Sequence, residues 1–410
     1  MACTGDGCIW SLVQRLGTET YINAVVNLGG GRLLAGTFPS GQIWRSADYG
    51  LTWSLIRSLG SNQWVRSFAT NGAGVVLAGT GSGGEIWRST DYGLTWTFIQ
   101  RLGTSTDIDS ICWIDGAIYL AGCYPSATIY RSTNGGLSWS LVKTLTGEQY
   151  VLSLVYQGFN IVLAGTADRG YVYKSNDKGL TWAYFKSCGA AVSVRSLCVG
   201  ASGLTLAGVG LTGSVWRNRF YGTEWVQVKS FTPDTDVWSI AWLGGAIFLA
   251  GLLPSGYVYK SLDGGASWTL AQCLGSETSV RSIVSLGSGI VIAGTGPSAQ
   301  IWRSAPLPPA PVAAFSGSPL WGWEPLDVQF TDESTNTPTS WLWSFGDGFF
   351  STEKNPLHSY ADHGVYTVSL QATNAGGSDS EIKSGYVTVL HPLPPTPEFS
   401  PIWTLQIGPR

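Results

Sequence analysis

Two registers of a 43-residue spacing hold the side chains best suited to chemistry. The first register holds Tyr21, Trp64, Asp107, Tyr150 and Asp236, with serine at its other two positions. The second lies two residues further on and holds Arg66, Asp109, Arg195, Trp238 and Arg281, with Asn23 and Leu152 completing it. Arginine binds carboxylates through a fork of N–H groups, and tyrosine and tryptophan offer flat amphipathic faces. Positions that vary among arginine, aspartate and tryptophan are not uniform core positions, so we predict that these side chains surround a ligand-binding site.

Both registers belong to a repeat that runs along most of the chain without an insertion or deletion. An aromatic residue before a basic residue recurs every 43 residues, at Trp44, Trp87, Tyr130, Tyr173, Trp216, Tyr259 and Trp302. Each repeat contains four short runs of β-branched and aromatic residues between glycine clusters, which is the pattern of strands. Seven such repeats predict an all-β fold, a seven-bladed β-propeller over residues 1–305. The two registers are then expected to ring the mouth of its central channel.

The two ends of the array are expected to share one blade. Trp10 lies 43 residues before Trp53, and "WSLVQRLG" at Trp10 matches "WSLIRSLG" at Trp53. The seventh repeat stops at Ala305, after three strand patterns. Residues about 8–16 should therefore supply the outer strand of the seventh blade and close the ring, so that deletion of residues 1–17 would destabilise all of it.

A second phrase, S-x-D-x-G-x-T-W, recurs between the third and fourth strand patterns. It resembles the Asp-box, or BNR repeat, of sialidases and sortilin-type receptors. The repeats at Ser46, Ser89, Ser132, Ser175 and Ser261 match it, whereas the fifth keeps only its glycine and tryptophan. Each box offers one carboxylate or amide, too few oxygens for a calcium loop. We expect a structural turn rather than a ligand or calcium site, carried by Asp48, Asp91, Asn134, Asp177 and Asp263.

The resemblance to sialidases raises glycoside hydrolysis as an alternative function. That chemistry would require a tyrosine paired with a glutamate and an acid/base aspartate. Glu19, Glu148 and Glu277 are expected near the mouth, beside the tyrosines. However, sialidases have six blades and an F-R-I-P-type motif that is absent here, and the loops are only three to six residues long. We therefore expect no catalytic residues. We favour a shallow platform that binds a glycan or a protein. The remaining alternative is that the residues around the mouth have only a structural role.

A different module follows the repeats. Residues 306–311 form a proline-rich linker, and residues 312–390 resemble a PKD domain, an immunoglobulin-like β-sandwich. The resemblance is carried by "WSFGDG" at Trp343, by His358 and Tyr360, and by "GVYTV" at Gly364. It implies a spacer or adhesive role. Residues 391–410 are proline-rich and then apolar. They are predicted to be a docking tail, which could bind capsid or tail proteins as an added strand, through Ile402, Trp403, Leu405 and Ile407.

Composition limits the partners. The chain has 410 residues, a formal charge of −3 and no basic block, which argues against nucleic-acid binding. No run of 18 apolar residues, no signal peptide and no regular cysteine or histidine spacing stands out, so we expect no membrane span, no disulfide framework, no metal and no cofactor. The prediction is a non-catalytic recognition or display protein on a virion or extracellular surface, such as a phage or archaeal virus decoration or adhesion protein. The alternatives are a secreted or cell-surface carbohydrate-binding protein of a prokaryote and a sialidase-like hydrolase.

Overall fold

The computed structural model describes residues 10–60, 63–189, 192–218, 224–287, 289–304, 310–374 and 377–392. The chain divides into two compact units, Met1–Pro306 and Leu307–Arg410. Both units are built from strands, and one short 3₁₀ turn, η1 (Ala201–Gly203), is the only helical element in the described part. No helix of those residues is long and apolar enough to cross a bilayer. The predicted all-β fold is confirmed.

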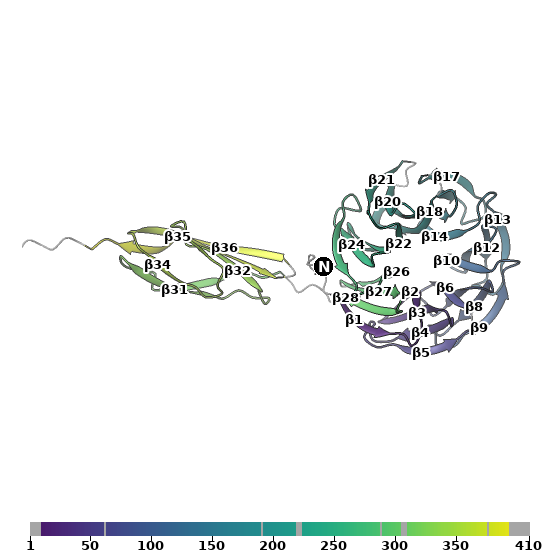
Figure 1. Ribbon diagram of the computed structural model, residues 1–410, viewed down its shortest axis with the longest axis horizontal. Coiled ribbons are helices and arrows are strands. Elements are labelled where there is room, and N and C mark those ends of the chain that lie inside the picture. Colours follow the sequence, from purple (N-terminus) through teal and green to yellow (C-terminus); the bar gives the residue numbers. More distant parts are fainter. Residues whose placement is uncertain are drawn as a thin grey trace, which may run out of the picture. The chain divides into compact units, whose positions relative to one another are not determined.

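The first unit is a ring of four-stranded antiparallel sheets, seven of them within the described residues (Figure 1). We call each sheet a blade and number the blades in chain order, with the innermost strand given first. The first four blades are β2 (Tyr21–Gly29), β3 (Arg32–Phe38), β4 (Gln42–Ser46), β5 (Ser54–Ser58); β6 (Trp64–Thr70), β7 (Val76–Gly81), β8 (Glu85–Ser89), β9 (Thr97–Arg101); β10 (Asp107–Asp115), β11 (Ile118–Tyr124), β12 (Thr128–Ser132), β13 (Ser140–Thr144); and β14 (Val151–Gly158), β15 (Ile161–Thr166), β16 (Tyr171–Ser175), β17 (Ala183–Ser187).

The other three blades include the one that joins the ends of the array. They are β18 (Ser193–Val199), β19 (Thr205–Gly210), β20 (Ser214–Asn218), β21 (Trp225–Ser230); β22 (Asp236–Gly244), β23 (Ile247–Leu253), β24 (Tyr257–Ser261), β25 (Thr269–Cys273); and β26 (Ser279–Gly287), β27 (Ile290–Gly296), β28 (Gln300–Ser304), β1 (Trp10–Arg15). The strand β1 pairs antiparallel with β28, with Trp10 opposite Ser304. The predicted closure by an N-terminal strand is therefore present.

The Ala-Gly pair of each repeat lets adjacent blades approach closely. A Cβ atom built on Gly36 would lie 2.3 Å from Cγ1 of Val65 on the next blade, and one on Gly122 would lie 2.5 Å from Cγ1 of Val151. The main apolar cores accordingly lie between blades. One cluster joins Leu34 of blade one to Val76 of blade two.

Hydrogen bonds also cross from blade to blade near the axis. Serines of the innermost strands donate to carbonyls of the next blade, as in Ser67 Oγ to Ile108 O at 3.1 Å and Ser239 Oγ to Val280 O at 3.1 Å. A serine bond also crosses the closure of the ring, but in the opposite direction, because Ser282 Oγ accepts from the Val25 N–H at 2.9 Å.

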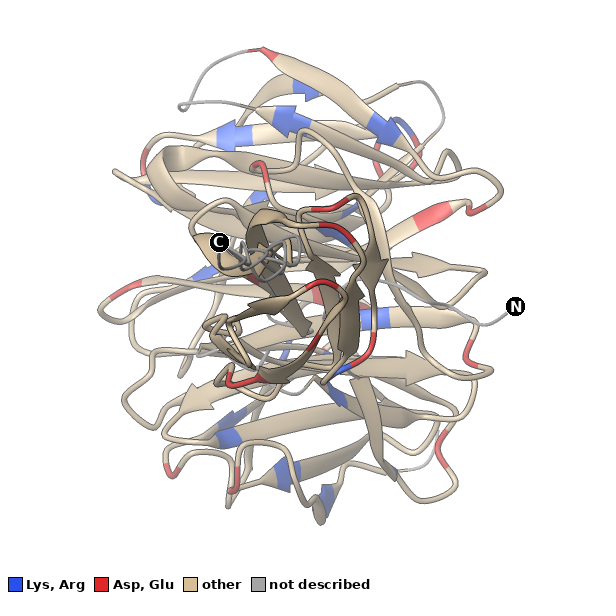
Figure 2. Ribbon diagram, turned by 90° about the vertical axis from the view of Figure 1, so that its left-hand side faces the viewer, with Lys and Arg blue, Asp and Glu red and all other residues tan. Residues whose placement is uncertain are grey.

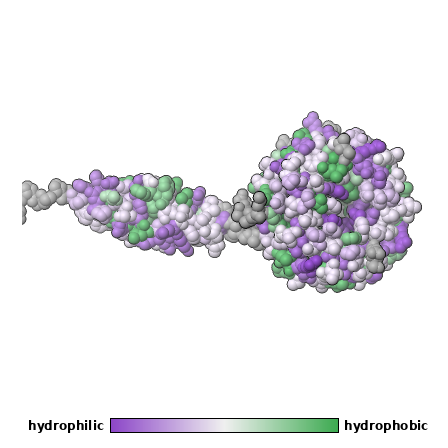
Figure 3. Space-filling view, viewed as in Figure 1, coloured by the Kyte–Doolittle hydropathy of each residue, from purple (hydrophilic) through white to green (hydrophobic). Residues whose placement is uncertain are grey.

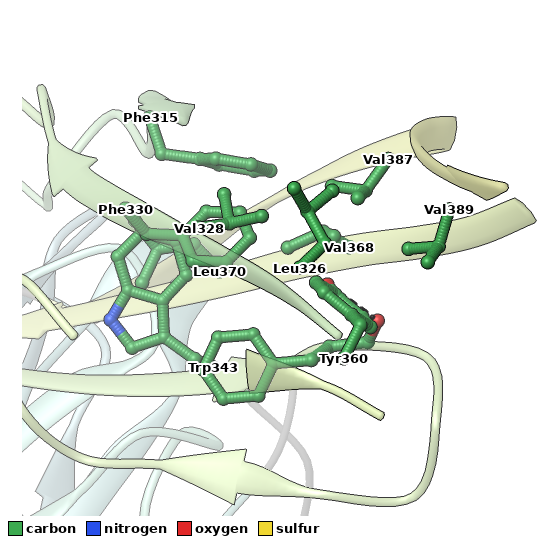
Figure 4. Close-up of a cluster of buried hydrophobic side chains, with 11 residues drawn as sticks. Phe315, Leu326, Val328, Phe330, Trp343, Tyr360, Val368, Leu370, Val387 and Val389 are labelled. Atoms are coloured by element: carbon green, nitrogen blue, oxygen red, sulfur yellow. Dashed lines mark hydrogen bonds between the residues drawn. The ribbon is translucent and has the colours of Figure 1, made fainter. Parts of the chain in front are cut away.

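The second unit is a β-sandwich. One sheet has the order β29 (Phe315–Ser318), β31 (Leu326–Asp332), β34 (Leu357–Tyr360), and the other has the order β30 (Trp321–Trp323), β36 (Gly377–Leu390), β35 (Gly364–Asn374), β32 (Ser340–Ser344), β33 (Phe350–Ser351). Its core surrounds the fully buried Trp343 and Tyr360 (Figure 4). The predicted linker lies mostly outside the described residues, and the apolar part of the predicted docking tail lies wholly outside them.

Cysteines behave in two ways. Cys112, Cys123, Cys188 and Cys198 are free thiols, and burial raises the pKa of Cys123 to about 12, which makes it an inert apolar side chain. Cys273 differs because it is disulfide-bonded. Cys123 and Cys188 are buried and Cys112 and Cys198 are partly buried, whereas the disulfide at Cys273 departs from the expectation that the cysteines form no disulfides.

Candidate functional site

A cavity of about 170 Å³ lies on the axis of the ring and takes one side chain from each blade. Its lining is the second register of the repeat: Asn23, Arg66, Asp109, Leu152, Arg195, Trp238 and Arg281. The structure thus brings together five of the ten predicted site residues. The predicted set omits Asn23 and Leu152, although the 43-residue spacing that identifies the other five also includes them. Figure 3 views the ring along this axis and shows hydrophilic residues around its hollow centre.

A β-bulge aims each of these side chains at the axis. The pairing of the innermost strand with the second strand shifts register between Val65 and Ser67, and therefore at Arg66. The same shift falls at the lining residue of all the other blades. A bulge leaves one residue out of the ladder and turns its side chain away from the usual alternation. The lining is therefore a repeated backbone feature whose side chain varies from blade to blade, with arginine in three of the seven.

Two of the three arginines are held by carboxylates. Arg66 lies 3.3 Å from Asp109 and 3.7 Å from Asp107, with its guanidinium carbon 4.4 Å from the Trp64 ring centroid. Arg195 donates from Nε to Asp236 Oδ1 at 2.9 Å. Asp107 and Asp236 are buried outside the cavity lining, so they position the arginines instead of facing a ligand.

The third arginine, Arg281, is held by aromatic rings. Its guanidinium carbon lies 3.7 Å from the Tyr21 ring centroid and 4.6 Å from that of Trp238, and Nη1 donates to Asn23 Oδ1 at 3.0 Å. Among the described residues it forms no ion pair with a carboxylate. Burial, together with the like charges of Arg66 and Arg195 and against the effect of Tyr21, lowers the pKa of Arg281 to about 10, which leaves it cationic at neutral pH.

Three buried polar atoms of the lining lack hydrogen-bond partners: Nε of Arg66, Nε of Arg281 and Oδ2 of Asp109. Burial raises the pKa of Asp109 to about 6, although the charge of Arg66 opposes that shift. Unpaired buried polar atoms cost free energy unless a ligand or water pairs with them. The cavity is therefore suited to a small polar guest.

The aromatic residues of the first register extend the site sideways. Tyr21 and Trp64 line a neighbouring hollow of about 250 Å³ with Phe38, whose ring is 5.0 Å from that of Trp64. Tyr150 lines another hollow of about 410 Å³ together with Leu152 and Arg195, and its ring stacks on Tyr124 at 4.1 Å. The three hollows share lining residues and so form one uneven surface.

The glutamates considered for hydrolysis have a structural role. Glu19 accepts from Thr37 Oγ1 at 2.8 Å and from the Ser40 N–H at 3.1 Å. Glu277 makes the equivalent bonds in blade seven, and Glu148 is buried in the same register. None of the three lines the axial cavity. Glu19 and Glu277 therefore hold loops beside the mouth, whereas Glu148 faces Arg169, whose Nε lies 4.0 Å from Oε1.

The boxes are turns fixed by their own side chains. Asp91 accepts from Ser89 Oγ at 2.7 Å, from the Leu94 N–H at 3.0 Å and from Thr95 Oγ1 at 2.6 Å. Burial alone would raise its pKa, but these hydrogen bonds hold the pKa below its usual value. The equivalent aspartates have the same environment, and the pKa of Asp263 falls to about 2.

Where the basic residue before this turn is an arginine, it donates to a turn carbonyl of the next blade. Arg88 Nε donates to the Gly135 carbonyl at 2.8 Å, and Arg303 Nε donates to the Tyr49 carbonyl at 3.0 Å across the closure of the ring. The box tryptophans are buried, as Trp53 and Trp96 show at 6% and 5% exposed. These contacts agree with the structural role predicted for the box.

Two motif residues of the second unit also meet, Asp347 of "WSFGDG" and His358. His358 Nε2 lies 2.7 Å from Asp347 Oδ2, and its ring stacks on Phe345 at 4.0 Å. This pair closes the "GDG" turn over the core. Figure 2 shows that charged residues elsewhere in the chain are scattered among uncharged ones.

Comparison with known proteins separates the two units. A family model described as "PKD domain" matches residues 310–389. Collagenase ColA of Bacillus cereus is 41% identical over 59 residues, which are 13% of this chain and 6% of that protein. The microbial collagenase of Vibrio alginolyticus is 41% identical over 54 residues, 12% and 7% of the two chains. The chain thus spans less than a tenth of the length of these curated relatives.

Solved structures resemble the ring. YCF48 bound to a D1 peptide superposes with a TM-score of 0.58 at 15% identity, covering 72% of this chain and 96% of that one. Virginiamycin B lyase from Staphylococcus aureus gives 0.62 at 12% identity, covering 73% and 99%. A GH74 xyloglucanase from Xanthomonas campestris gives 0.60 at 14% identity, covering 79% and 59%. Likeness at these identities shows the fold alone. The chain is therefore a β-propeller followed, at residues 310–389, by a member of the PKD domain family.

Proposed function

We propose that this protein is a non-catalytic recognition protein whose axial cavity binds an anionic group of a glycan or protein on a surface. The observation that carries the proposal is Arg281, a buried cation held by two aromatic rings and an amide, with no carboxylate partner among the described residues. A carboxylate, sulfate or phosphate group would complete its hydrogen bonding and offset its charge.

The size of the cavity limits what enters it. Pockets for drug-sized ligands span about 300–1,000 Å³, whereas the axial cavity has about 170 Å³. Only an anionic group and its immediate surroundings fit there. The rest of the ligand would lie across the aromatic hollows at Trp64 and Tyr150. An acidic sugar within a longer glycan has this shape, and an acidic side chain or chain end of a protein is the alternative ligand.

The lining favours recognition over glycoside hydrolysis. Hydrolysis canonically uses two carboxyl groups on either side of the scissile bond. Asp109 is the one carboxylate among the described lining residues, and it is paired with Arg66. The absence of catalysis remains a prediction that an activity assay tests directly.

An extracellular setting is supported by both units. PKD domains are typical of extracellular proteins, and Cys273 is disulfide-bonded, as cysteines are in oxidising compartments. We propose that the PKD domain serves as a spacer or attachment module. The narrower prediction, a virion decoration or adhesion protein, is tested by the neighbouring genes, because capsid and tail genes there would support it and secretion genes would favour a cell-surface protein.

The decisive experiment compares acidic and neutral glycans. Wild-type protein and the Arg281→Ala variant are applied to an array of sialylated, uronate-containing and sulfated glycans with their neutral counterparts, and the hits are quantified by calorimetry. We expect acidic glycans to bind, and Arg281→Ala to weaken binding about 10- to 100-fold, the value of a charged hydrogen bond. Lys143→Ala on the outer strand β13 removes the same charge elsewhere and should leave the affinity unchanged.

Three results would overturn parts of the proposal. Binding that Arg281→Ala leaves intact would place the ligand elsewhere. Failure of every acidic glycan and acidic peptide to bind would remove the anion-binding function. Release of sugar from a glycan, lost in Asp109→Asn, would establish a hydrolase.

A further inference from the structure

Two of the three histidines of the chain meet one glutamate at one end of the PKD domain. Glu324 directly follows β30, His391 directly follows β36, and His363 directly precedes β35. These three strands are neighbours in the order β30-β36-β35, with Trp323 opposite Leu390 and Gly364 opposite Val389. The sheet therefore brings the three side chains to a common edge.

Backbone contacts fix this meeting point. The Glu324 N–H donates to the Leu390 carbonyl at 3.0 Å, which holds the glutamate beside His391. The other end of β36 lies near the start of the domain, where the Ala313 N–H donates to Asp379 Oδ2 at 2.9 Å. The cluster thus lies at the end of the domain opposite Ala313.

The carboxylate lies between the two imidazole rings. Glu324 Oε2 is 3.1 Å from His363 Nδ1, and Glu324 Oε1 contacts His391 Nδ1. The ring centroids are 5.1 Å apart, and the ligand atoms of all three residues lie within 4.8 Å of one another. The side chains of both histidines are nearly two-thirds exposed, so their rings are free to turn.

We propose that Glu324, His363 and His391 bind a zinc ion. Tetrahedral zinc with bonds of about 2.0–2.1 Å places its ligand atoms about 3.4 Å apart, and the 3.1 Å between Glu324 Oε2 and His363 Nδ1 is close to that spacing. Two imidazole nitrogens and one carboxylate oxygen are zinc ligands, and the fourth position is left for water. Calcium does not match, because it takes six to eight oxygen ligands and the cluster offers one carboxylate.

A zinc ion bound by these residues would link the ends of three strands. Metal binding to the folded domain and not to the unfolded chain stabilises the fold by mass action. A zinc ion here would join β30, β36 and β35 at the point where the chain leaves the sandwich. The inference is independent of the anion-binding proposal, because it concerns the other unit of the chain.

The test uses the full chain after removal of any affinity tag and after dialysis against a chelator. Zinc is titrated by calorimetry and counted per chain by elemental analysis, and cobalt is added separately for its tetrahedral absorption spectrum. We expect one zinc per chain. His363→Ala, His391→Ala and Glu324→Gln should each weaken binding by about 100-fold or more, exceeding the usual effect of outer-shell residues. Glu353→Gln, at an exposed glutamate of the same domain, is the matched control and should bind zinc as the wild type does.

Zinc should also raise the thermal midpoint of unfolding of the wild type and of Glu353→Gln. It should leave the midpoints of the three ligand variants unchanged. Melting in chelator tests whether the ligand variants are folded. The two histidine variants should melt as the wild type does, because both side chains are nearly two-thirds exposed. The proposal would be overturned if the wild-type protein bound no zinc at concentrations on the order of 100 μM. It would also be overturned if all three ligand variants bound zinc as the wild type does. Cobalt that binds without a tetrahedral spectrum would contradict the proposed geometry.

Discussion

Asp109 and Arg281 are buried charges in one cavity, and burial acts on them in opposite directions. Removal from water raises the pKa of Asp109 to about 6 and lowers the pKa of Arg281 to about 10. Both groups have buried atoms without partners. Sites that keep such groups do so at a cost to stability, which is the usual condition of a preorganised binding site.

The pH dependence of stability should report Asp109. Its pKa is higher in the folded protein than the ordinary 3.8, so the folded state holds the proton more tightly. Its contribution to stability is present below about pH 4 and is lost as the pH rises through about 6. A shift of this size corresponds to a free energy on the order of 3 kcal/mol. The free energy of unfolding of Asp109→Asn, measured by denaturant titration from pH 4 to 7.5, should therefore rise relative to wild type across this window.

Other carboxylates titrate in the same range, so the difference between variant and wild type is the quantity to measure. Asp332→Asn, at a residue of the PKD domain outside the cavity, is a control for the general effect of removing a carboxylate. A difference curve for Asp109→Asn that is flat between pH 4 and 7 would contradict the raised pKa.

At the scale of elements, the box turn joins the third and fourth strands and also contacts the preceding blade. A Cβ atom on Gly93 would lie 2.6 Å from Cδ1 of Leu34, and Gly93 has a φ of +81°. A carbonyl of the same turn also bonds to the preceding blade: Arg45 Nε donates to the Tyr92 carbonyl at 3.3 Å. The turn therefore sets both the strand connection and the distance between blades.

Blade three supplies a natural substitution for this turn. Asn134 replaces the aspartate, accepts from the Ser138 N–H at 3.0 Å and donates to Ser138 Oγ at 2.8 Å. Asp91→Asn should therefore be tolerated, whereas Asp91→Ala loses the turn hydrogen bonds and should cost about 1–2 kcal/mol. Thermal denaturation of the two variants distinguishes them. Equal loss in both would mean that the charge, and not the hydrogen bonds, holds the turn.

At the scale of the whole molecule, the ring depends on its closing strand. Trp10 of β1 is 6% exposed and packs in a cluster with Leu249 and Val280, so it bridges the sixth and seventh blades. Leu12, two residues further along the same strand, is 49% exposed. A closed ring has no free blade face, because every interface is buried between neighbours.

Truncation of that tryptophan tests the closure. Trp10→Ala should lower the free energy of unfolding of the propeller by about 3–5 kcal/mol, because it leaves a cavity between two blades. Leu12→Ala should change it by less than about 0.5 kcal/mol, since an exposed side chain is removed. Tryptophan fluorescence during denaturant unfolding measures both. Similar stability of the two variants would show that the closure contributes little to the ring.

The period, the strands, the closing strand and the PKD domain can be predicted from the amino-acid sequence alone. These features depend on residues at fixed spacing, such as Trp10 and Trp53, or on a short contiguous motif, such as "WSFGDG". The spacing also placed the arginines of the site in one register. Residues that are 43 positions apart occupy the same place in successive blades. A set of such residues therefore forms a circle around the axis of the ring.

Which of these residues line the cavity depends on the folded backbone. The bulge at Arg66 and its equivalents turns the second register into the cavity, whereas Asp107 of the first register is buried beside it. The meeting of Glu324 with His363 and His391 follows no spacing, because neighbouring strand ends bring together residues far apart in the chain. Contacts of this kind depend on strand order and burial, which a linear pattern does not contain.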